Sequence, residues 1–239
     1  MALLPVRQFR VIENRVEAKE TFTLVLEPAD DEPMFAFEAG QFVMAHLPSD
    51  DGKTKAKAYS IATAPCESSE RFELGIKREG EFTSNLKNLR AGDSVGVQGP
   101  YGRFVLKKDA APLVLFAGGI GITPLRSMLR EALFTGMTCD IRLFISDRDD
   151  VCMAYESELR ELAKKYPNFH PIFLFTRNAP NDRPCEACRL TPEIVRREIP
   201  DLRGAQFYMC GPKPFMQCVK EILEGLGVDT KSRLKQELF

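Results

Sequence analysis

The sequence carries almost no net charge, because its 33 lysines and arginines balance 34 aspartates and glutamates. A strongly basic or strongly acidic chain would indicate a nucleic acid or a charged membrane surface as the partner. The balance favours neither, so we predict no nucleic-acid partner. Any electrostatic recognition must depend on a few local charges.

Long apolar runs are also absent. No stretch approaches the roughly 18 consecutive apolar residues of a transmembrane helix. The chain also reaches Arg7 and Arg10 before an apolar stretch of signal-peptide length develops. We therefore expect no transmembrane segment, and a cytoplasmic protein.

Histidine is scarce. The two histidines, His46 and His170, do not supply the further ligands that Cys185-x-x-Cys188 would need in a zinc site. The cysteines number seven and are scattered, which fits reduced thiols better than a disulfide framework. For this CxxC pair we favour free thiols over a redox pair, and a redox pair over a metal site.

What the sequence does contain is a strongly patterned C-terminal half. Residues 113–116 are apolar without alternation, as in a strand buried on both faces. A glycine-rich turn follows. Apolar residues then recur at helical spacing, namely Leu125, Met128, Leu129, Ala132 and Leu133.

The same alternation of strand and helix continues to the end of the chain. Further apolar strands are expected at 141–145, 169–175 and 206–210, each followed by a helical pattern or a loop. This order predicts an α/β Rossmann-like parallel sheet over residues 112–239, with ligands at the carboxyl ends of its strands.

The turn after the first of these strands is the best candidate for binding an anion. Glycines let the backbone approach a phosphate, and a helix start, with Thr123 as the expected N-cap and Pro124 in the first turn, offers free N–H groups. Gly119-Ile-Gly121 matches only half of the dinucleotide fingerprint, because Pro124 replaces its third glycine. A tight strand-to-helix turn without a ligand is the alternative.

The N-terminal half carries short strand signals separated by Gly, Pro, Asp and Ser. They lie at 21–26, 41–47, 58–62, 72–77 and 93–97. Short strands at this spacing predict a small antiparallel barrel or sandwich over residues 1–108, joined to the second unit by a linker near 107–112.

One segment of this half combines a cation, an aromatic ring and a hydroxyl: Lys57-Ala58-Tyr59-Ser60. On a strand Lys57 and Tyr59 share a face, so the ring would cover a flat ligand while the ammonium meets a phosphate. A surface lysine beside a core tyrosine is the alternative.

A second segment places hydroxyl residues just after a glycine. Gly80 precedes Thr83 and Ser84 at the start of a short helical stretch. This pattern suits an ordinary N-cap, and it also suits a second anion site at a helix start.

Taken in order, the motifs resemble those of the ferredoxin–NADP reductase superfamily over essentially the whole chain. The matching segments are 40–42, 57–60, 80–84, 92–93, 99–104, 117–124 and 210–215. The resemblance implies an antiparallel β-barrel that holds FAD, followed by a Rossmann-like domain that holds a nicotinamide nucleotide. No segment resembles an attached iron–sulfur domain.

The resemblance also implies roles in the barrel. Tyr59 would stack on the flavin and Ser60 would lie near flavin N5. Lys57 stands where the family has arginine, which keeps the charge but loses the bidentate fork. Thr83 and Ser84, after Gly80, would contact the flavin phosphates.

In the second domain, the resemblance implies a pyrophosphate site, a nicotinamide site and a closing segment. The pyrophosphate would be held by Gly118, Gly119, Gly121 and Thr123. Cys210, with Gly211 and Pro212 after it, would adjoin the nicotinamide. At the chain end, the carboxylate of Glu237 would lie near the active site, and the ring of Phe239 would cover the flavin face.

Two signals bear on the choice between NADH and NADPH. Thr176-Arg177 resembles a Ser-Arg pair that binds the 2′-phosphate of NADPH, and Arg148 would add charge. Asp147 argues the other way, because a carboxylate after this strand binds an unphosphorylated ribose. We favour NADPH slightly.

The activity implied is hydride transfer from NAD(P)H to bound FAD, followed by electron transfer to a separate acceptor such as ferredoxin or flavodoxin. Ser60, Cys210 and Glu237 are the residues expected to position and tune this step. Two alternatives remain at this point, a flavin subunit of a larger redox complex and a nucleotide-binding domain without turnover.

Overall fold

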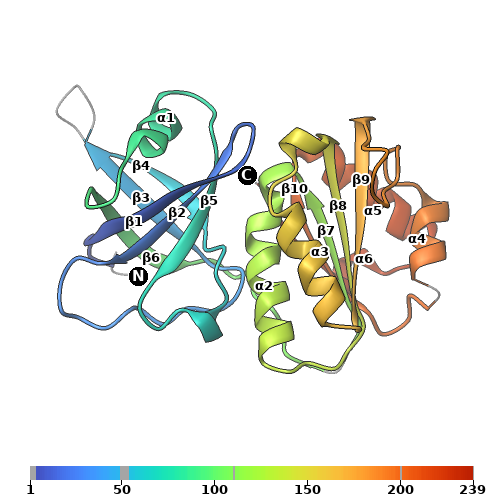
Figure 1. The fold of residues 1–239 in the computed structure, drawn as a ribbon. Helices are drawn as coiled ribbons and strands as arrows, with labels where there is room; N and C mark the ends of the chain where they lie inside the picture. The colour runs from blue at the N-terminus through green and yellow to red at the C-terminus, as the bar shows by residue number, and fades with distance from the viewer. Residues whose placement is uncertain (1–3, 49–53, 110, 200, 239) are drawn as a thin grey trace.

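The computed structural model describes residues 4–48, 54–109, 111–199 and 201–238. It contains two units, each built around one sheet, and a helix of the second unit, α2 (Ile122–Phe134), lies against the first (Figure 1). The fold class expected from the sequence is confirmed: an antiparallel unit precedes a parallel α/β unit.

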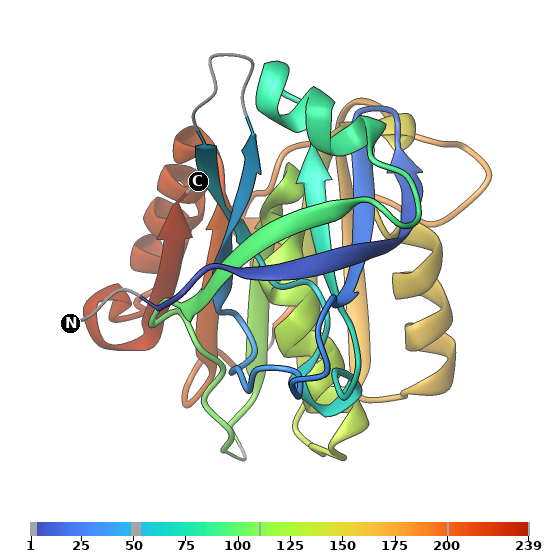
Figure 2. The same cartoon turned by 90° about the vertical axis from the view of Figure 1, so that its left-hand side faces the viewer.

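The N-terminal unit is a sheet of six antiparallel strands in the order β4-β3-β6-β1-β2-β5. The strands are β1 (Arg7–Ala18), β2 (Thr21–Pro28), β3 (Phe42–Pro48), β4 (Thr54–Ser60), β5 (Phe72–Lys77) and β6 (Ser94–Tyr101). Beyond the end of β4, Ile61 bridges to Leu74 of β5, so the sheet curls until its two outer strands approach each other (Figure 2). Between β4 and β5 lies the short 3-10 helix η1 (Pro65–Glu67), and β5 is followed by α1 (Glu81–Asn88).

The inner face of this barrel is filled by alternating apolar side chains. Phe9 contacts Phe35 and Phe72 edge-to-face, with ring centroids 5.7 and 5.3 Å apart. The other face of the sheet is largely solvated, as the burial alternation along β1 and β3 shows.

The C-terminal unit is a five-stranded parallel sheet in the order β11-β10-β7-β8-β9. Its strands are β7 (Leu113–Gly118), β8 (Ile141–Asp149), β9 (Phe169–Asn178), β10 (Gln206–Gly211) and β11 (Leu234–Leu238). Its further helices are η2 (Gly119–Gly121), η3 (Asp150–Cys152), α3 (Glu156–Lys165), α4 (Pro192–Glu198), α5 (Lys213–Gly225) and α6 (Thr230–Arg233).

Two apolar cores cover the two faces of this sheet. One joins the sheet to α2 and α3, and the other joins it to α4 and α5. All six residues of β7 are buried, which explains why this strand has no polar alternation. Helix α2 therefore packs on the sheet with one side and meets the barrel with another.

Several boundaries differ from those expected. Strand β4 ends at Ser60 rather than continuing to residue 62, β6 extends to Tyr101, and β1 was not expected at all. Strand β1 is interrupted by register shifts at Val11/Glu13 and Val16/Ala18, which disturb the two-residue alternation. Residues 108–112, where the sequence predicts the domain boundary, lie between the end of β6 and the start of β7. The boundary itself stays a prediction.

Candidate active site

The carboxyl ends of β7 and β10 form the centre of the candidate site. From β7 the chain winds outward to β8 and β9, and then returns to the other side through β10 and β11. Doubly wound sheets bind ligands at such a reversal of strand order. The glycine-rich turn and the Cys210-Gly211-Pro212 segment, far apart in sequence, therefore lie together.

The glycines of this centre are required for different physical reasons. A Cβ on Gly121 would overlap the carbonyl oxygen of Cys210, and a Cβ on Gly211 would come within 2.9 Å of the Gly118 Cα. A Cβ on Gly118 would meet Phe215. These three positions thus need glycine so that the two turns can pack. Gly119, at φ +53°, has open space beside it and faces Asp147.

Thr123 is not the N-cap of α2, contrary to the sequence prediction. The helix begins at Ile122, with Gly121 as the N-cap and without a side-chain cap hydrogen bond. The Thr123 hydroxyl instead donates to the Ile120 carbonyl at 3.0 Å. The reason is that the turn itself is already helical, as η2, so that the chain enters α2 two residues earlier than expected.

A cavity of about 240 Å³ opens between the barrel and this turn. Of the residues predicted for the flavin, Lys57, Ala58, Tyr59, Ser60 and Thr83 line it, together with Gly75, Lys77, Glu79, Ile120 and Thr123. The barrel and the nucleotide-binding unit both contribute walls, so a flat ligand here would touch both.

Tyr59 is the aromatic wall of this cavity. Its ring lies nearly parallel to that of Phe82, at 12° with centroids 6.4 Å apart. Its hydroxyl is buried without a hydrogen-bond partner among the described residues, and burial raises the pKa of Tyr59 to about 12. An orphaned hydroxyl beside a cavity fits a polar, planar ligand.

The start of α1 shows what Gly80, Thr83 and Ser84 do. Gly80 has φ +105°, which favours glycine. The Thr83 hydroxyl accepts from the Glu79 N–H at 2.7 Å and donates to the Gly80 carbonyl at 3.0 Å. That hydroxyl is used within the turn, so a bound phosphate would depend on the half-buried Ser84 and on the backbone N–H groups of the helix start.

A second cavity, of about 370 Å³, shares Lys77 and Ile120 with the first. The other residues that line it are Lys19, Glu20, Thr21, Gly119, Asp147, Arg148, Asp149, Cys152, Ala154 and Arg177. With Lys77 included, four side chains of this cavity are cations and three are carboxylates, which suits a ligand that carries both phosphate and ribose.

Asp147 and Arg177 both line this second cavity, so the structure brings the two competing signals of the sequence together. Burial raises the pKa of Asp147, although the Arg148 N–H donates to its carboxylate at 2.8 Å. Thr176 is exposed, and its hydroxyl donates to the Asp147 carbonyl at 3.3 Å.

Ser60, Cys210 and Glu237 meet at the edge of the two units. Strands β10 and β11 pair in register, with Cys210 beside Glu237, and the Ser60 hydroxyl donates to Glu237 Oε2 at 3.5 Å across the units. Burial raises the pKa of Glu237 to about 7, against the lowering effect of the Ser60 hydrogen bond. Burial first, and then the Glu237 charge, raise the pKa of the Cys210 thiol, which therefore stays protonated. Phe239 lies outside the described residues.

The sequence reasoning missed Lys77, Gly75 and Lys19. Lys77 ends β5 and lines both cavities, and Gly75 lies in the same strand. Lys19 reaches the second cavity from the β1–β2 turn. In a sequence, lysines at strand ends look like ordinary solvated charges and give no signal of a site. Only Gly75 could have been noticed, because a glycine inside a strand often marks a place where a ligand or another part of the chain approaches the backbone closely.

The cysteine pair of the long loop is divided between two environments. Cys185 packs against the core that contains α2 and α3, whereas Cys188 packs against the core that contains α4 and α5. Both are free thiols, and within the described ranges no three metal-ligating side chains are grouped into a metal site. None of the helices in the described part of the chain is long and apolar enough to span a bilayer.

Comparisons with known proteins agree with this arrangement. Residues 8–106 match the oxidoreductase FAD-binding domain family, and residues 115–221 match the oxidoreductase NAD-binding domain family. A flavohemoprotein of Rhodopirellula baltica is 30% identical over 98% of this chain and 60% of its own length. The glycine betaine monooxygenase reductase subunit of Chromohalobacter salexigens is 30% identical over 98% of this chain and 63% of its own.

A solved structure shares the fold of this chain over nearly the full length of both proteins. The flavohem-like FAD/NAD-binding domain of nitric oxide dioxygenase from Vibrio cholerae superposes with a TM-score of 0.88 and is 25% identical, covering 98% of both chains. The chain thus spans about 60% of the length of the curated relatives named above and nearly all of this isolated domain.

Proposed function

Because the chain belongs to the FAD- and NAD-binding oxidoreductases, as its ferredoxin–NADP reductase-like motifs indicate, we propose that it reduces bound FAD with NAD(P)H and then passes electrons to a separate acceptor. The observation that carries this proposal is the pair of adjoining cavities. One is lined by the barrel motif and the other by the turns of the parallel sheet, and Lys77 and Ile120 belong to both.

When bound, FAD supplies the ring atom that accepts the hydride, so the protein needs to orient two rings and exclude water. Tyr59 offers an aromatic face on which the flavin ring can stack, and the nearby Lys57 offers a positive charge to the FAD pyrophosphate. The free N–H groups of η2 and α2 serve the phosphates of the nicotinamide nucleotide.

Ser60, Cys210 and Glu237 are proposed to act where the two rings meet. The neutral thiol of Cys210 presents an uncharged surface to the nicotinamide. Glu237, whose pKa of about 7 lets it gain or lose a proton near neutrality, holds that proton next to the Ser60 hydroxyl. The Ser60 hydroxyl would then share a proton network with the flavin edge.

The acceptor is proposed from the relatives. One relative is named a flavohemoprotein and another a reductase subunit of a monooxygenase, and this chain spans about 60% of each. We propose that the electrons leave for a separate redox protein, such as a ferredoxin, a flavodoxin or a haem protein, in the cytoplasm. A flavin subunit of a larger complex is the second candidate, favoured by the same relatives.

Anaerobic stopped-flow spectroscopy tests the proposal. The FAD-loaded protein is mixed with NADH or NADPH, and the bleaching of flavin absorbance is followed. It is then reoxidised with ferredoxins, flavodoxins, haem proteins and ferric chelates. We expect the flavin absorbance to bleach during the stopped-flow record, and the reduced flavin to be reoxidised rapidly by one class of acceptor. A protein that binds FAD but is not bleached by either nucleotide would contradict the proposal.

A further inference from the structure

Arg126 is a charged side chain buried between the two units, with only 3% of its side chain exposed. Its Nη1 lies 2.6 Å from Glu73 Oε2, which belongs to β5 of the barrel. Its Nε and Nη2 lie 2.9 and 2.8 Å from Glu158 Oε2, which belongs to α3. One guanidinium therefore joins a carboxylate of each unit. Burial alone would lower the pKa of Arg126, but Glu158 and Glu73 outweigh it and keep the pKa raised.

The same residue also holds the backbone that continues from Ser60. Arg126 Nη1 donates to the Ala62 carbonyl at 2.9 Å, and the Ser127 hydroxyl donates to the Thr63 carbonyl at 2.6 Å. Two consecutive residues of α2 therefore fix two consecutive carbonyls just beyond the flavin motif.

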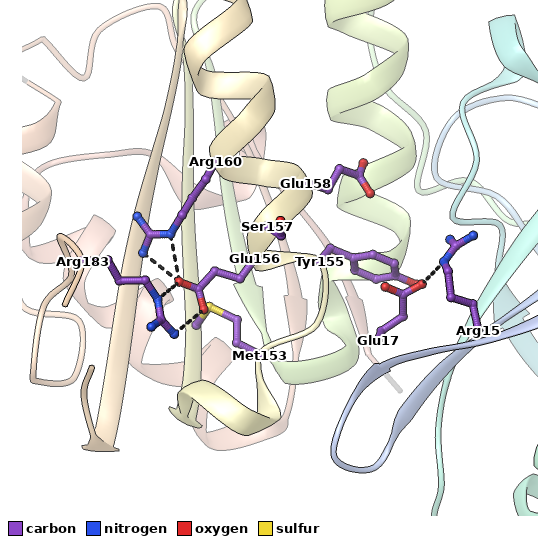
Figure 3. Close-up of a pocket in the computed structure, with 9 residues that line it drawn as sticks. All are labelled: Arg15, Glu17, Met153, Tyr155, Glu156, Ser157, Glu158, Arg160 and Arg183. Atoms are coloured by element: carbon purple, nitrogen blue, oxygen red, sulfur yellow. Dashed lines mark hydrogen bonds and ion pairs between the residues drawn. The ribbon is translucent and has the colours of Figure 1, made fainter. Parts of the chain in front are cut away.

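Tyr155 connects this contact to β2 and β5. The Arg126 guanidinium lies 4.6 Å from the centre of the Tyr155 ring, and the Tyr155 hydroxyl lies 2.8 Å from Thr23 Oγ1. A Cβ on Gly75 would overlap both the Tyr155 hydroxyl and Thr123. Figure 3 shows the Tyr155 side chain reaching from the start of α3 towards Arg15 and Glu17 of β1.

Tyr155 has a left-handed backbone conformation, which is unfavourable for a non-glycine residue unless tertiary contacts hold it. Its φ is +62°, and it is the single non-glycine residue with a positive φ among the described residues. Such strain persists where neighbouring contacts over-determine a conformation. The contacts with Arg126 and Thr23 are the ones that hold this ring.

We propose that Arg126 is a positioning residue for hydride transfer. It fixes the start of α2, where the nucleotide phosphates are expected, relative to β4 and β5, which line the flavin cavity, and it thereby sets the approach of the two rings. This inference rests on the proposed function. Arg126 lines neither cavity, so it acts through the backbone at Ala62 and through Glu73 rather than on a ligand.

The geometry separates ligand affinity from the rate of transfer. Eight of the ten residues that line the first cavity belong to the barrel, and eight of the twelve that line the second belong to the parallel-sheet unit. Affinity for each ligand should therefore depend mainly on one unit, whereas transfer requires both units in register. Losing Arg126 should therefore lower the rate of transfer far more than the affinity for the nucleotide.

The test is single-turnover flavin reduction in the full FAD-loaded chain, normalised to FAD content. With Arg126→Met we expect the limiting rate to fall by about 10- to 100-fold, as misplacement of about 1 Å does in other enzymes. The nucleotide Kd should change by less than about 3-fold, a difference of under about 0.7 kcal/mol. The long-wavelength charge-transfer absorbance between the two rings should weaken. Arg126→Lys should recover the rate only partly, because an ammonium lacks the planar fork.

Arg130→Met is the matched control. Arg130 lies one turn along α2 and pairs with Glu158 and, across the units, with Glu67, but no hydrogen bond joins it to the described backbone of residues 60–63. Its limiting rate should stay within about 3-fold of the wild type. A general loosening of the interface would instead slow both variants alike.

A second readout needs no cofactor. In the apoprotein, the Ile61 and Ala62 N–H groups donate to the Gln41 and Glu73 carbonyls. Their hydrogen exchange should accelerate in Arg126→Met and remain unchanged in Arg130→Met. Ser127→Ala, which removes the Thr63 hydrogen bond without changing a charge, serves if Arg126→Met does not fold. It should lower the limiting rate by about 3- to 10-fold at constant Kd.

The possible failures are distinguishable. If the wild type is not bleached by either nucleotide, the proposed function fails. If the wild type is bleached but Arg126→Met and Ser127→Ala keep its limiting rate and charge-transfer band, the positioning role is overturned. It is also overturned if Arg130→Met loses as much rate as Arg126→Met.

Discussion

Glu237 couples the candidate site to pH. Its pKa is raised from 4.5 to about 7, mainly by burial, so the folded state retains a proton that the unfolded state has already released between these values. Stability should therefore fall as the pH rises from 4.5 to 7. We expect Glu237→Gln, which resembles the protonated acid, to be more stable relative to the wild type at pH 8 than at pH 4.5, by about 1–2 kcal/mol after discounting for solvent screening.

Urea unfolding at the two pH values measures this difference directly. Comparing the variant with the wild type at each pH removes the titration of all other groups. An equal stability difference at both pH values would show that Glu237 has an ordinary pKa.

Arg177 is the residue through which we expect nucleotide choice to be made. It lines the second cavity together with Arg148 and Asp147. If Arg177 pairs with the 2′-phosphate, Arg177→Ala should lower kcat/KM for NADPH by about 10-fold and for NADH by less than about 3-fold. Steady-state reduction of ferricyanide measures both values, and Arg203→Ala, remote and exposed, is the control. An unchanged ratio between the nucleotides would refute the assignment of the 2′-phosphate contact to Arg177.

At single positions, the sequence indicates side chains whose type carries the chemistry. Tyr59 and Ser60 were predicted from the sequence as flavin-site residues; both line the first cavity, and their roles at the flavin stay predictions. Lys77 was not predicted, because its role arises only when β5 and the turn after β7 lie face to face. The sequence around a lysine does not show which distant segment it will face in the folded protein.

At the scale of elements, Gly121, the last residue of η2 and the N-cap of α2, gives a sharp test. Gly121→Ala would push a Cβ into the backbone of Cys210, so we expect it to destabilise the protein by about 2–3 kcal/mol. Gly225 lies in the last turn of α5 with nothing near its Cβ position, and Gly225→Ala should stabilise by about 0.5–1 kcal/mol. Thermal unfolding compares the two. Equal effects would mean that the turns of β7 and β10 do not pack as described.

Elements with a clean period were predictable and interrupted ones were not. The continuous apolar run of β7 and the helical spacing of α2 gave both elements correctly. Strand β1 was missed because two bulges break its alternation. The predicted cap at Thr123 was wrong because a 3-10 turn precedes α2, and hydroxyl chemistry alone does not reveal this.

At the scale of the whole molecule, the site exists because two sheets meet across one helix. The motifs indicated two units and placed Ser60 and Glu237 at one site, but they gave no sign of the hydrogen bond between these two residues or of an arginine that bridges Glu73 and Glu158. Those contacts depend on the orientation of the units, to which buried polar side chains contribute together with the apolar core that joins Ala39, Phe104 and Leu106 to α2.

The final prediction concerns the strength of that connection. Removing one partner of a buried ion pair is costly, and Glu73→Gln would leave Arg126 with only Glu158 as its carboxylate partner, so we expect it to destabilise the protein by about 1–3 kcal/mol. In a double-mutant cycle with Arg126→Met, we expect a coupling of about 1–3 kcal/mol that changes little between low and high salt, because both groups are largely shielded from solvent. The exposed pair Arg203 and Asp201 should show no measurable coupling at high salt. Since Glu73 belongs to the barrel and Arg126 to the nucleotide-binding unit, a coupling near zero would mean that the two units are joined by other contacts, and that the guanidinium is not what holds them in register.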